Sequence, residues 1–205
     1  VKTALTARML NCGQSCIAAK RFILVEGVYD EFVSKFSEAV RSLKFGDPMD
    51  ESTQIGPLAR IDLADELQDQ VKKSIELGAE LLTGGNQNGA YHDPTVLGNV
   101  KPGMPAFDEE TFGPLAAIYK FKTEDEVLDM ANDCEVGLSS YLYTKDMARI
   151  NKFTAELEVG EVHVNGFKYS IYLPHGGVKE SGLGHDCSHL ALNDYLEIKR
   201  ITQRI

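Results

Sequence analysis

The chain has 205 residues, of which 43% are hydrophobic and 25% are charged, a composition typical of a globular protein. The sum of 21 basic and 31 acidic residues gives a formal net charge of -10. Such a surface repels nucleic-acid phosphate and anionic lipid, and no apolar run approaches the ~20 residues that a membrane span needs. We therefore expect neither nucleic acid nor a membrane as a partner.

The cysteines are too few to form a disulfide scaffold in a chain of this length. Cys12 and Cys16 are four residues apart, which is not the spacing of a redox or zinc motif, and no second pair follows. Cys187 lies between two histidines but has no distant partner. The sequence therefore predicts no metal site and a reduced thiol protein of the cytoplasm.

Helix and strand patterns alternate along the first 121 residues. Apolar residues recur at helical spacing over residues 28–44 and 63–75, and each run ends at glycine or proline. Strands and a first helix fill the intervals, and they are expected at 1–11 (helix), 21–26, 79–83, 95–100 and 115–121 (strands).

The same alternation continues in the second half of the chain. Thr123 and Glu126 fit a capping box that starts a third amphipathic helix. Strands at 139–143 and 161–164 flank a helix near 146–157. This order predicts an α/β fold with a largely parallel, helix-covered sheet, which we assign to one domain over residues 1–193.

Two segments near the C-terminus differ from this pattern. Residues 165–188 are rich in Gly, Ser, His and Lys without periodicity, and a loop of that length is usually functional. Apolar and polar residues alternate over 194–201. We expect an exposed edge strand there that pairs with a second copy of the chain through residues 194–202, because edge strands seek partners.

The segment around Cys16 carries the sharpest chemical signal. Gly13 and Gln14 end the first helix and let the backbone turn tightly, so Cys16 lies at a turn where free N–H groups could stabilise a thiolate or an oxyanion. The alternative is that Cys16 is a small buried hydrophobic residue, the usual fate of a free cysteine. Cys12 is expected to serve packing.

Two further segments carry weaker signals. Glu109 and Glu110 precede a Gly-Pro turn and could accept the hydrogens of a ribose diol, or they could lie in a solvated acidic loop. The glycines of residues 175–184 do not open a helix after a strand, so they fail as a dinucleotide fingerprint, and a loop over an active site suits them better. His163, in an apolar strand, is expected to be a core residue with a satisfied hydrogen bond.

Together these segments resemble the aldehyde dehydrogenase superfamily. The family's cysteine signature is matched by Asn11-Cys-Gly-Gln-Ser-Cys16, its Glu-x-Phe-Gly-Pro motif by Glu110-Thr-Phe-Gly-Pro114, and its late loop by residues 174–184. The likeness covers essentially the whole chain. The sequence around Cys16 and that of residues 46–60 are most similar to the bacterial succinate-semialdehyde dehydrogenases.

The resemblance implies a mechanism and a set of site residues. Cys16 would attack an aldehyde, hydride would pass to NAD or NADP, and water would release the acid from a thioester. Glu110 would bind the nicotinamide ribose, Phe112 would pack beside the cofactor, and Ser170 would bind the substrate carboxylate. In some related enzymes an arginine before the motif's asparagine also binds that carboxylate, but Leu10 stands here, which leaves the preferred aldehyde length open.

The resemblance also implies that an N-terminal cofactor-binding domain is absent from this chain. Only about ten residues precede the cysteine motif, and the first is Val1 rather than Met. The general base would lie in the absent part, so the isolated chain is expected to be inactive. Two alternatives remain, namely a CoA-acylating aldehyde dehydrogenase, which needs no general base, and a non-catalytic interaction module.

Overall fold

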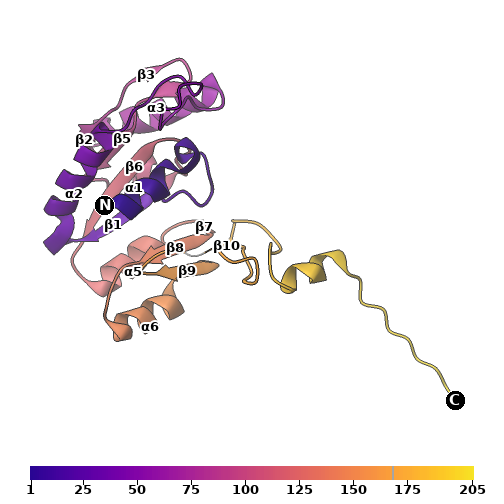
Figure 1. Cartoon of the computed structure of the whole chain (residues 1–205). Coiled ribbons are helices and arrows are strands. Elements are labelled where there is room, and N and C mark those ends of the chain that lie inside the picture. The colour runs from indigo at the N-terminus through magenta and orange to yellow at the C-terminus, as the bar shows by residue number, and fades with distance from the viewer. Residues whose placement is uncertain (168) are drawn as a thin grey trace. The chain divides into compact units, whose positions relative to one another are not determined.

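A computed structural model describes residues 1–167 and 169–205. Contacts divide the chain into two compact units, Val1–Val127 and Leu128–Ile205 (Figure 1). Among the described residues, no helix is both long enough and apolar enough to cross a membrane.

The first unit is built on a four-stranded sheet with the order β1-β6-β5-β2. Its strands are β1 (Arg21–Val25), β2 (Glu80–Thr83), β5 (Thr95–Gly98) and β6 (Leu115–Phe121). β1 and β5 both run parallel to the central β6, and only β2 is antiparallel to its neighbour. The expected α/β fold with a largely parallel sheet is confirmed.

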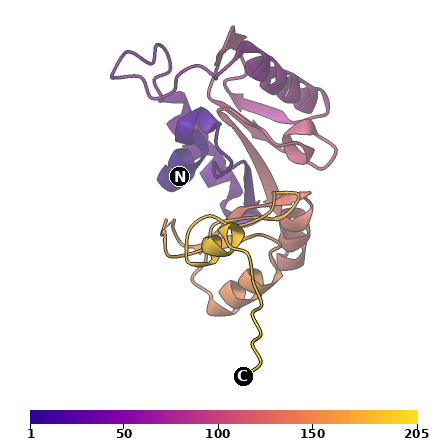
Figure 2. The same ribbon diagram turned by 90° about the vertical axis from the view of Figure 1, so that its right-hand side faces the viewer.

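Helices cover both faces of this sheet (Figures 1 and 2). They are α1 (Lys2–Met9), α2 (Glu26–Arg41), α3 (Ile61–Glu76) and α4 (Pro105–Asp108), while α5 (Glu124–Asn132) follows β6 and includes the boundary between the two units. On one face Phe36 of α2 packs against Phe22 of β1, with ring centroids 5.3 Å apart. On the other face the Tyr119 hydroxyl of β6 donates to the Ala106 carbonyl of α4 at 2.9 Å. Among the apolar residues whose spacing predicted α2 and α3, Phe36, Val40, Leu67 and Val71 are buried, whereas Val28 is exposed.

Short elements separate these larger ones. A tight antiparallel pair forms between β3 (Gln87–Asn88) and β4 (Tyr91–His92).

α5 begins as the capping box predicts, because the Glu126 N–H donates to Thr123 Oγ1 at 3.2 Å. The Glu126 carboxylate accepts from the Lys122 N–H, one residue before the cap.

The second unit contains two small sheets. Its elements are β7 (Val136–Gly137), β8 (Ser139–Leu142), α6 (Met147–Glu156), β9 (Glu161–Val164) and β10 (Val178–Lys179). β8 and β9 are parallel and are connected through α6, as the sequence predicts. β10 pairs antiparallel with β7, so part of the glycine-rich loop forms a strand that the sequence did not indicate.

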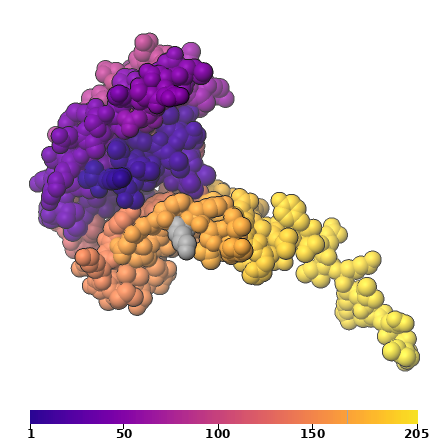
Figure 3. Space-filling view, in the orientation of Figure 1, coloured from indigo at the N-terminus to yellow at the C-terminus, as the bar shows by residue number. Residues whose placement is uncertain are grey.

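The C-terminal segment corrects one expectation. A 3-10 helix covers Leu190–Tyr195, so the strand expected from residue 194 does not begin there. After Tyr195 the described chain forms no strand, although a strand would need a hydrogen-bonded neighbour there. The space-filling view draws this end of the chain in yellow (Figure 3). Leu196, Ile198 and Ile201 are exposed. Pairing of this segment with a second chain stays a prediction.

Candidate functional site

The segment that carries Cys16 leaves α1 through an unusual backbone path. Asn11, Cys12 and Gly13 have φ values of 49°, 56° and 76°, a left-handed stretch that reverses the chain direction. A turn follows, closed by the Ala18 N–H donating to the Ser15 carbonyl at 3.1 Å. Cys16 lies within this turn and is exposed, so the alternative of a buried structural cysteine is wrong for it.

Side chains on both sides of this reversal hold it in place. The Asn11 amide donates to the Gln14 carbonyl at 3.0 Å, and the Gln14 amide oxygen accepts from the Ala59 N–H at 2.9 Å. Cys12 is half-buried, and its Sγ accepts from the Gly56 N–H at 3.2 Å. Cys12 therefore anchors the segment, which agrees with the packing role expected for it.

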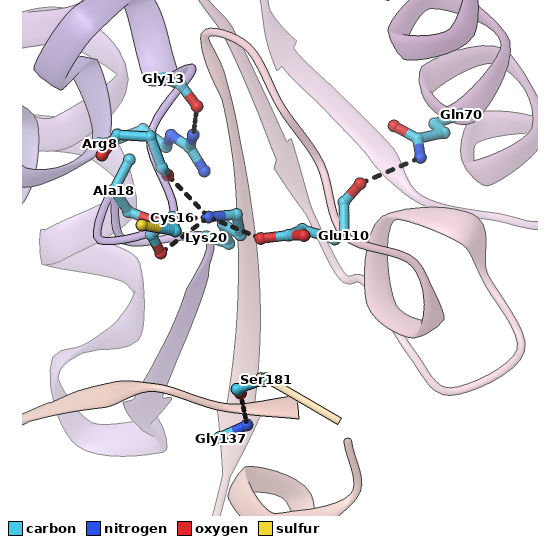
Figure 4. Close-up of polar contacts among 10 residues, drawn as sticks. Arg8, Gly13, Cys16, Ala18, Lys20, Gln70, Glu110, Gly137 and Ser181 are labelled. Carbon is cyan, nitrogen blue, oxygen red and sulfur yellow. Dashed lines mark hydrogen bonds and ion pairs between the residues drawn. The ribbon is translucent and has the colours of Figure 1, made fainter. Parts of the chain in front are cut away.

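The second motif meets the first one directly. The Gly113 N–H donates to the Gly13 carbonyl at 3.2 Å. Figure 4 shows the second contact, in which Glu110 Oε1 lies 3.1 Å from Lys20 Nζ. The exposed ring of Phe112 lies 4.7 Å from the same Lys20 nitrogen. The structure thus brings Cys16, Glu110 and Phe112 together in one unit.

Lys20 is the cation at this junction. Its ammonium donates to the carbonyl oxygens of Ser15, Cys16 and Ala18 at 2.9, 3.2 and 3.3 Å. Burial lowers the pKa of Lys20, and the Glu110 carboxylate opposes that shift by favouring the charged form.

Arg8 lies beside residues 13–18, the nucleophile turn that carries Cys16, and is fully buried. Its Nη2 donates to the Gly13 carbonyl at 2.7 Å, while Nε and Nη1 have no hydrogen-bond partner among the described residues. Burial lowers the pKa of Arg8 to about 10, and the Glu110 carboxylate partly offsets this shift. Gly13 therefore accepts from both Arg8 and Gly113, which ties the reversal to two neighbouring segments.

A hollow of about 520 Å³ opens beside Glu110 and Phe112. It is lined by Leu63, Glu66, Leu67, Gln70, Glu109, Glu110 and Phe112. Gln70 of α3 donates to Glu109 Oε2 at 2.9 Å, which fixes one of the acidic side chains. Apolar side chains and carboxylates share this hollow, and that combination suits a ribose bearing a flat aromatic ring.

The late loop lies in the second unit. The Gly137 N–H donates to Ser181 Oγ at 2.7 Å (Figure 4), and a Cβ on Gly160 would lie 1.8 Å from the Gly176 carbonyl oxygen. The loop is therefore packed closely onto the strands of its own unit. Ser170 is half-buried in this unit, and its Oγ accepts from the Tyr172 N–H at 3.4 Å.

A carboxylate in the second unit binds two histidines. Glu161 is 3.2 Å from His163 Nε2 and 2.7 Å from His175 Nδ1. The His163 ring also stacks on Tyr141, with ring centroids 5.1 Å apart. His163 is half-buried rather than in the core, but its hydrogen bond is satisfied as expected.

Sequence reasoning missed Arg8, Lys20 and Gln70. Arg8 gave no signal because an arginine in a helix is expected to be exposed. Lys20 follows Cys16 by four residues, a spacing that could have drawn attention to it. Its partner Glu110 is distant in sequence, and no local pattern predicts that pair.

The fold and this site define a class of protein. Residues 1–201 match the model of the aldehyde dehydrogenase family, and the chain belongs to that family.

Among its relatives is Sad of Escherichia coli (strain K12), named as a succinate semialdehyde dehydrogenase that uses NAD(P)+, at 46% identity. That match covers 98% of this chain and 44% of the relative. The solved succinate-semialdehyde dehydrogenase of Burkholderia pseudomallei is 38% identical with a TM-score of 0.91, covering 95% of this chain and 41% of that one. An aldehyde dehydrogenase of Physcomitrella patens, in complex with the reaction product succinate, is 35% identical with a TM-score of 0.91, covering 96% and 41%. The chain thus spans less than half the length of these proteins.

Proposed function

We propose that this chain carries the nucleophile and part of the cofactor site of an enzyme that oxidises succinate semialdehyde to succinate with NAD+ or NADP+. The observation that carries the proposal is the junction of two motifs, in which Gly113 bonds to Gly13 and Glu110 pairs with Lys20. These contacts hold an exposed thiol, Cys16, in the same unit as the candidate ribose carboxylate. The names of the relatives support the aldehyde and the cofactor.

In the proposed reaction the Cys16 thiol loses its proton to water and its Sγ forms a bond to the aldehyde carbon. The π electrons of the carbonyl bond move to the aldehyde oxygen, which gains negative charge. Among the described residues the Cys16 N–H has no acceptor, so it can donate to that oxygen and stabilise the thiohemiacetal. When bound, a nicotinamide dinucleotide would supply a hydride acceptor, and loss of hydride from the thiohemiacetal carbon would leave a thioester on Cys16. Water then displaces Cys16 as a thiol and leaves the acid.

Glu110 and Phe112 are the residues proposed to hold the cofactor. Lys20 pairs with Glu110 Oε1, which leaves Oε2 as an acceptor for a ribose hydroxyl. Phe112 lines the same hollow, where its ring can pack against the nicotinamide.

Ser170 is proposed to bind the substrate carboxylate. Its Oγ already accepts from the Tyr172 N–H, so its own O–H remains as a donor to a carboxylate oxygen. The general base is proposed to lie in a cofactor-binding domain outside this chain, while residues 1–193 form the catalytic domain. The four cysteines are free, which supports a reducing compartment such as the cytoplasm.

The test uses the chain itself, because thiohemiacetal formation requires no cofactor. Under limiting iodoacetamide, peptide mapping should find Cys16 alkylated first, since it is exposed and the other three cysteines are half-buried. Succinate semialdehyde should slow that alkylation reversibly, and propanal at equal concentration should slow it less.

Two variants serve as controls for this experiment. Cys16→Ser should abolish the protected label, and Ser170→Ala should reduce the difference between the two aldehydes. If Cys134 or Cys187 reacts first, or if the semialdehyde protects no thiol, the proposal fails.

A further inference from the structure

We propose that Lys20 is a positioning residue that fixes the nucleophile turn relative to the ribose carboxylate. Its ammonium contacts three carbonyls of residues 15–18 and the Glu110 carboxylate, so one side chain connects the two motifs (Figure 4). The inference deepens the proposed function and rests on it.

The contacts of Lys20 use all of its donors. An ammonium has three N–H groups, and here four oxygen atoms and the face of Phe112 surround it. Its side chain is only 15% exposed, so water contributes little to its hydration. A buried cation is costly unless it is paired and hydrogen-bonded, and these contacts supply that compensation.

An ion pair elsewhere in the same unit shows the contrast. Lys35 pairs with Glu31 on the surface of α2, where the two side chains are 62% and 72% exposed. Exposed pairs of this kind contribute little, because solvent screens them. Lys20 differs in its burial and in its bonds to the turn that carries Cys16.

Two connections are needed to fix one segment relative to another. The bond from the Gly113 N–H to the Gly13 carbonyl supplies the first, and a single hydrogen bond leaves rotation about it. The pair of Lys20 and Glu110 supplies the second, because Lys20 is also bonded to the carbonyls of Ser15, Cys16 and Ala18. Hydride transfer requires the thiohemiacetal carbon to face the nicotinamide, and an error of about 1 Å can cost ~10²-fold in rate. Lys20 therefore determines how the nucleophile faces the cofactor.

Arg8 is a second cation that acts on Glu110. Arg8 and Lys20 both interact with the Glu110 carboxylate, so two cations act on one acidic group. The Cys16 thiolate in turn raises the pKa of Lys20, the weakest of the influences on that group.

The experiment compares Lys20→Met, Lys20→Arg and the matched control Lys35→Met in the full 205-residue chain. The readouts are the ratio of iodoacetamide labelling at Cys16 to that at Cys134, and hydrogen exchange in segments 13–18 and 110–114. Lys20→Met should lower the labelling ratio about tenfold, within the range of coupled polar networks, and should raise exchange in both segments together.

Lys20→Arg should keep most of the wild-type labelling ratio, because arginine is also a cation with several hydrogen-bond donors. A merely space-filling role would instead be satisfied by methionine, which has a similar length. Lys35→Met should leave both readouts at the wild-type values. A wild-type ratio in Lys20→Met, or exchange that rises in only one segment, overturns the inference.

A second variant covers the case in which Lys20→Met fails to fold. Glu110→Gln keeps the side-chain shape and should raise exchange in segment 13–18, although none of its residues has changed. No rise there overturns the inference. If instead succinate semialdehyde fails to protect Cys16 in the wild-type chain, the proposed function itself has failed, so the two failures are distinguishable.

Discussion

The nucleophile segment (residues 8–20) and the C-terminal segment (residues 190–205) show opposite ways of using side chains. The first is held by polar contacts inside its own unit, with Arg8 fully buried and Lys20 bonded to three carbonyls. The second exposes large apolar side chains, and Ile198 has the full exposure of an isolated residue. Chemistry needs fixed atoms, whereas association needs apolar surface.

This difference indicates where each segment obtains its free energy. Polar contacts are directional, so the nucleophile turn can be fixed within the first unit. Apolar surface gains free energy only when it leaves water, at about 25 cal/mol per Å². The C-terminal segment therefore gains stability when another surface covers it, and we propose that a second copy of the chain does so.

The largest expected effect follows from removing this segment. A chain that ends at Asn193 lacks Leu196, Ile198 and Ile201, and we expect it to lose its assembly and fall to the mass of a monomer. Multi-angle light scattering of both chains measures the change. The nucleophile segment should keep its labelling at Cys16, because its contacts lie within the first unit.

Substitutions separate the apolar contribution from chain length. Ile198→Asp combined with Ile201→Asp should reproduce the loss of assembly, while Lys199→Ala should leave it intact. An unchanged mass for the truncated chain would show that residues 194–202 are not the interface.

The sequence predicted the larger elements of this fold well. Apolar periodicity located α2 and α3, and the capping box located the start of α5 at Glu124. Both signals are local, because they depend on residues within one or two turns of each other. The β3–β4 pair was missed because strands of two residues are too short to show an alternation.

The site was predicted only as far as its motifs extend. Local features singled out Cys16 and Glu110 as candidates, the family motif added Phe112, and the structure brings the three together in one unit. The left-handed conformations of Asn11 and Cys12 were missed, since glycine is the residue expected there. The contacts of Arg8 and Lys20 depend on packing between distant segments, which no local pattern records. For the C-terminal segment, alternation predicted a strand but could not supply the neighbour that a strand needs.

The next largest effect concerns Gly13 in the nucleophile segment. Its φ of 76° disfavours any side chain, and a Cβ there would lie 1.9 Å from the Gly113 carbonyl oxygen. Gly13→Ala should therefore push the two motifs apart and lower the free energy of unfolding by about 2–4 kcal/mol, from backbone strain and overpacking together. Urea unfolding measures this loss, and Cys16 should also lose its priority in alkylation.

Gly103 provides the matched control for this substitution. Its φ of 89° is similarly left-handed, but a Cβ there would meet no atom within 4 Å. Gly103→Ala should cost only the backbone strain, about 1 kcal/mol, and should leave Cys16 labelling unchanged. Equal losses for the two variants would mean that the contact between Gly13 and Gly113 is not what matters.

The smallest effect concerns a buried histidine of the first unit. His92 on β4 is 1% exposed; its Nδ1 lies 2.9 Å from the Asp93 carbonyl oxygen, and its Nε2 has no partner among the described residues. Burial lowers the pKa of His92 below its usual 6.5, because the charged ring is poorly solvated there. The folded state therefore holds His92 neutral at a pH where the unfolded chain protonates it.

The sign of the resulting pH dependence follows from proton binding. Below pH 6.5 the unfolded chain binds more protons at His92 than the folded chain, so stability present above pH 6.5 is lost as the pH falls toward the folded pKa. One group contributes at most about 1.4 kcal/mol per pH unit, which places this effect below that of Gly13→Ala.

His92→Phe, which cannot titrate, should flatten the dependence of unfolding free energy on pH. The interval to measure runs from pH 7.5 to 5.5, about one unit on either side of the usual histidine pKa. His185→Asn, at an exposed position in the second unit, should leave the slope as it is in the wild type. The slope, rather than the stability at one pH, is the decisive measurement, because replacing a buried ring also changes packing at every pH. A slope that survives in His92→Phe would assign the acid sensitivity of the first unit to its carboxylates instead.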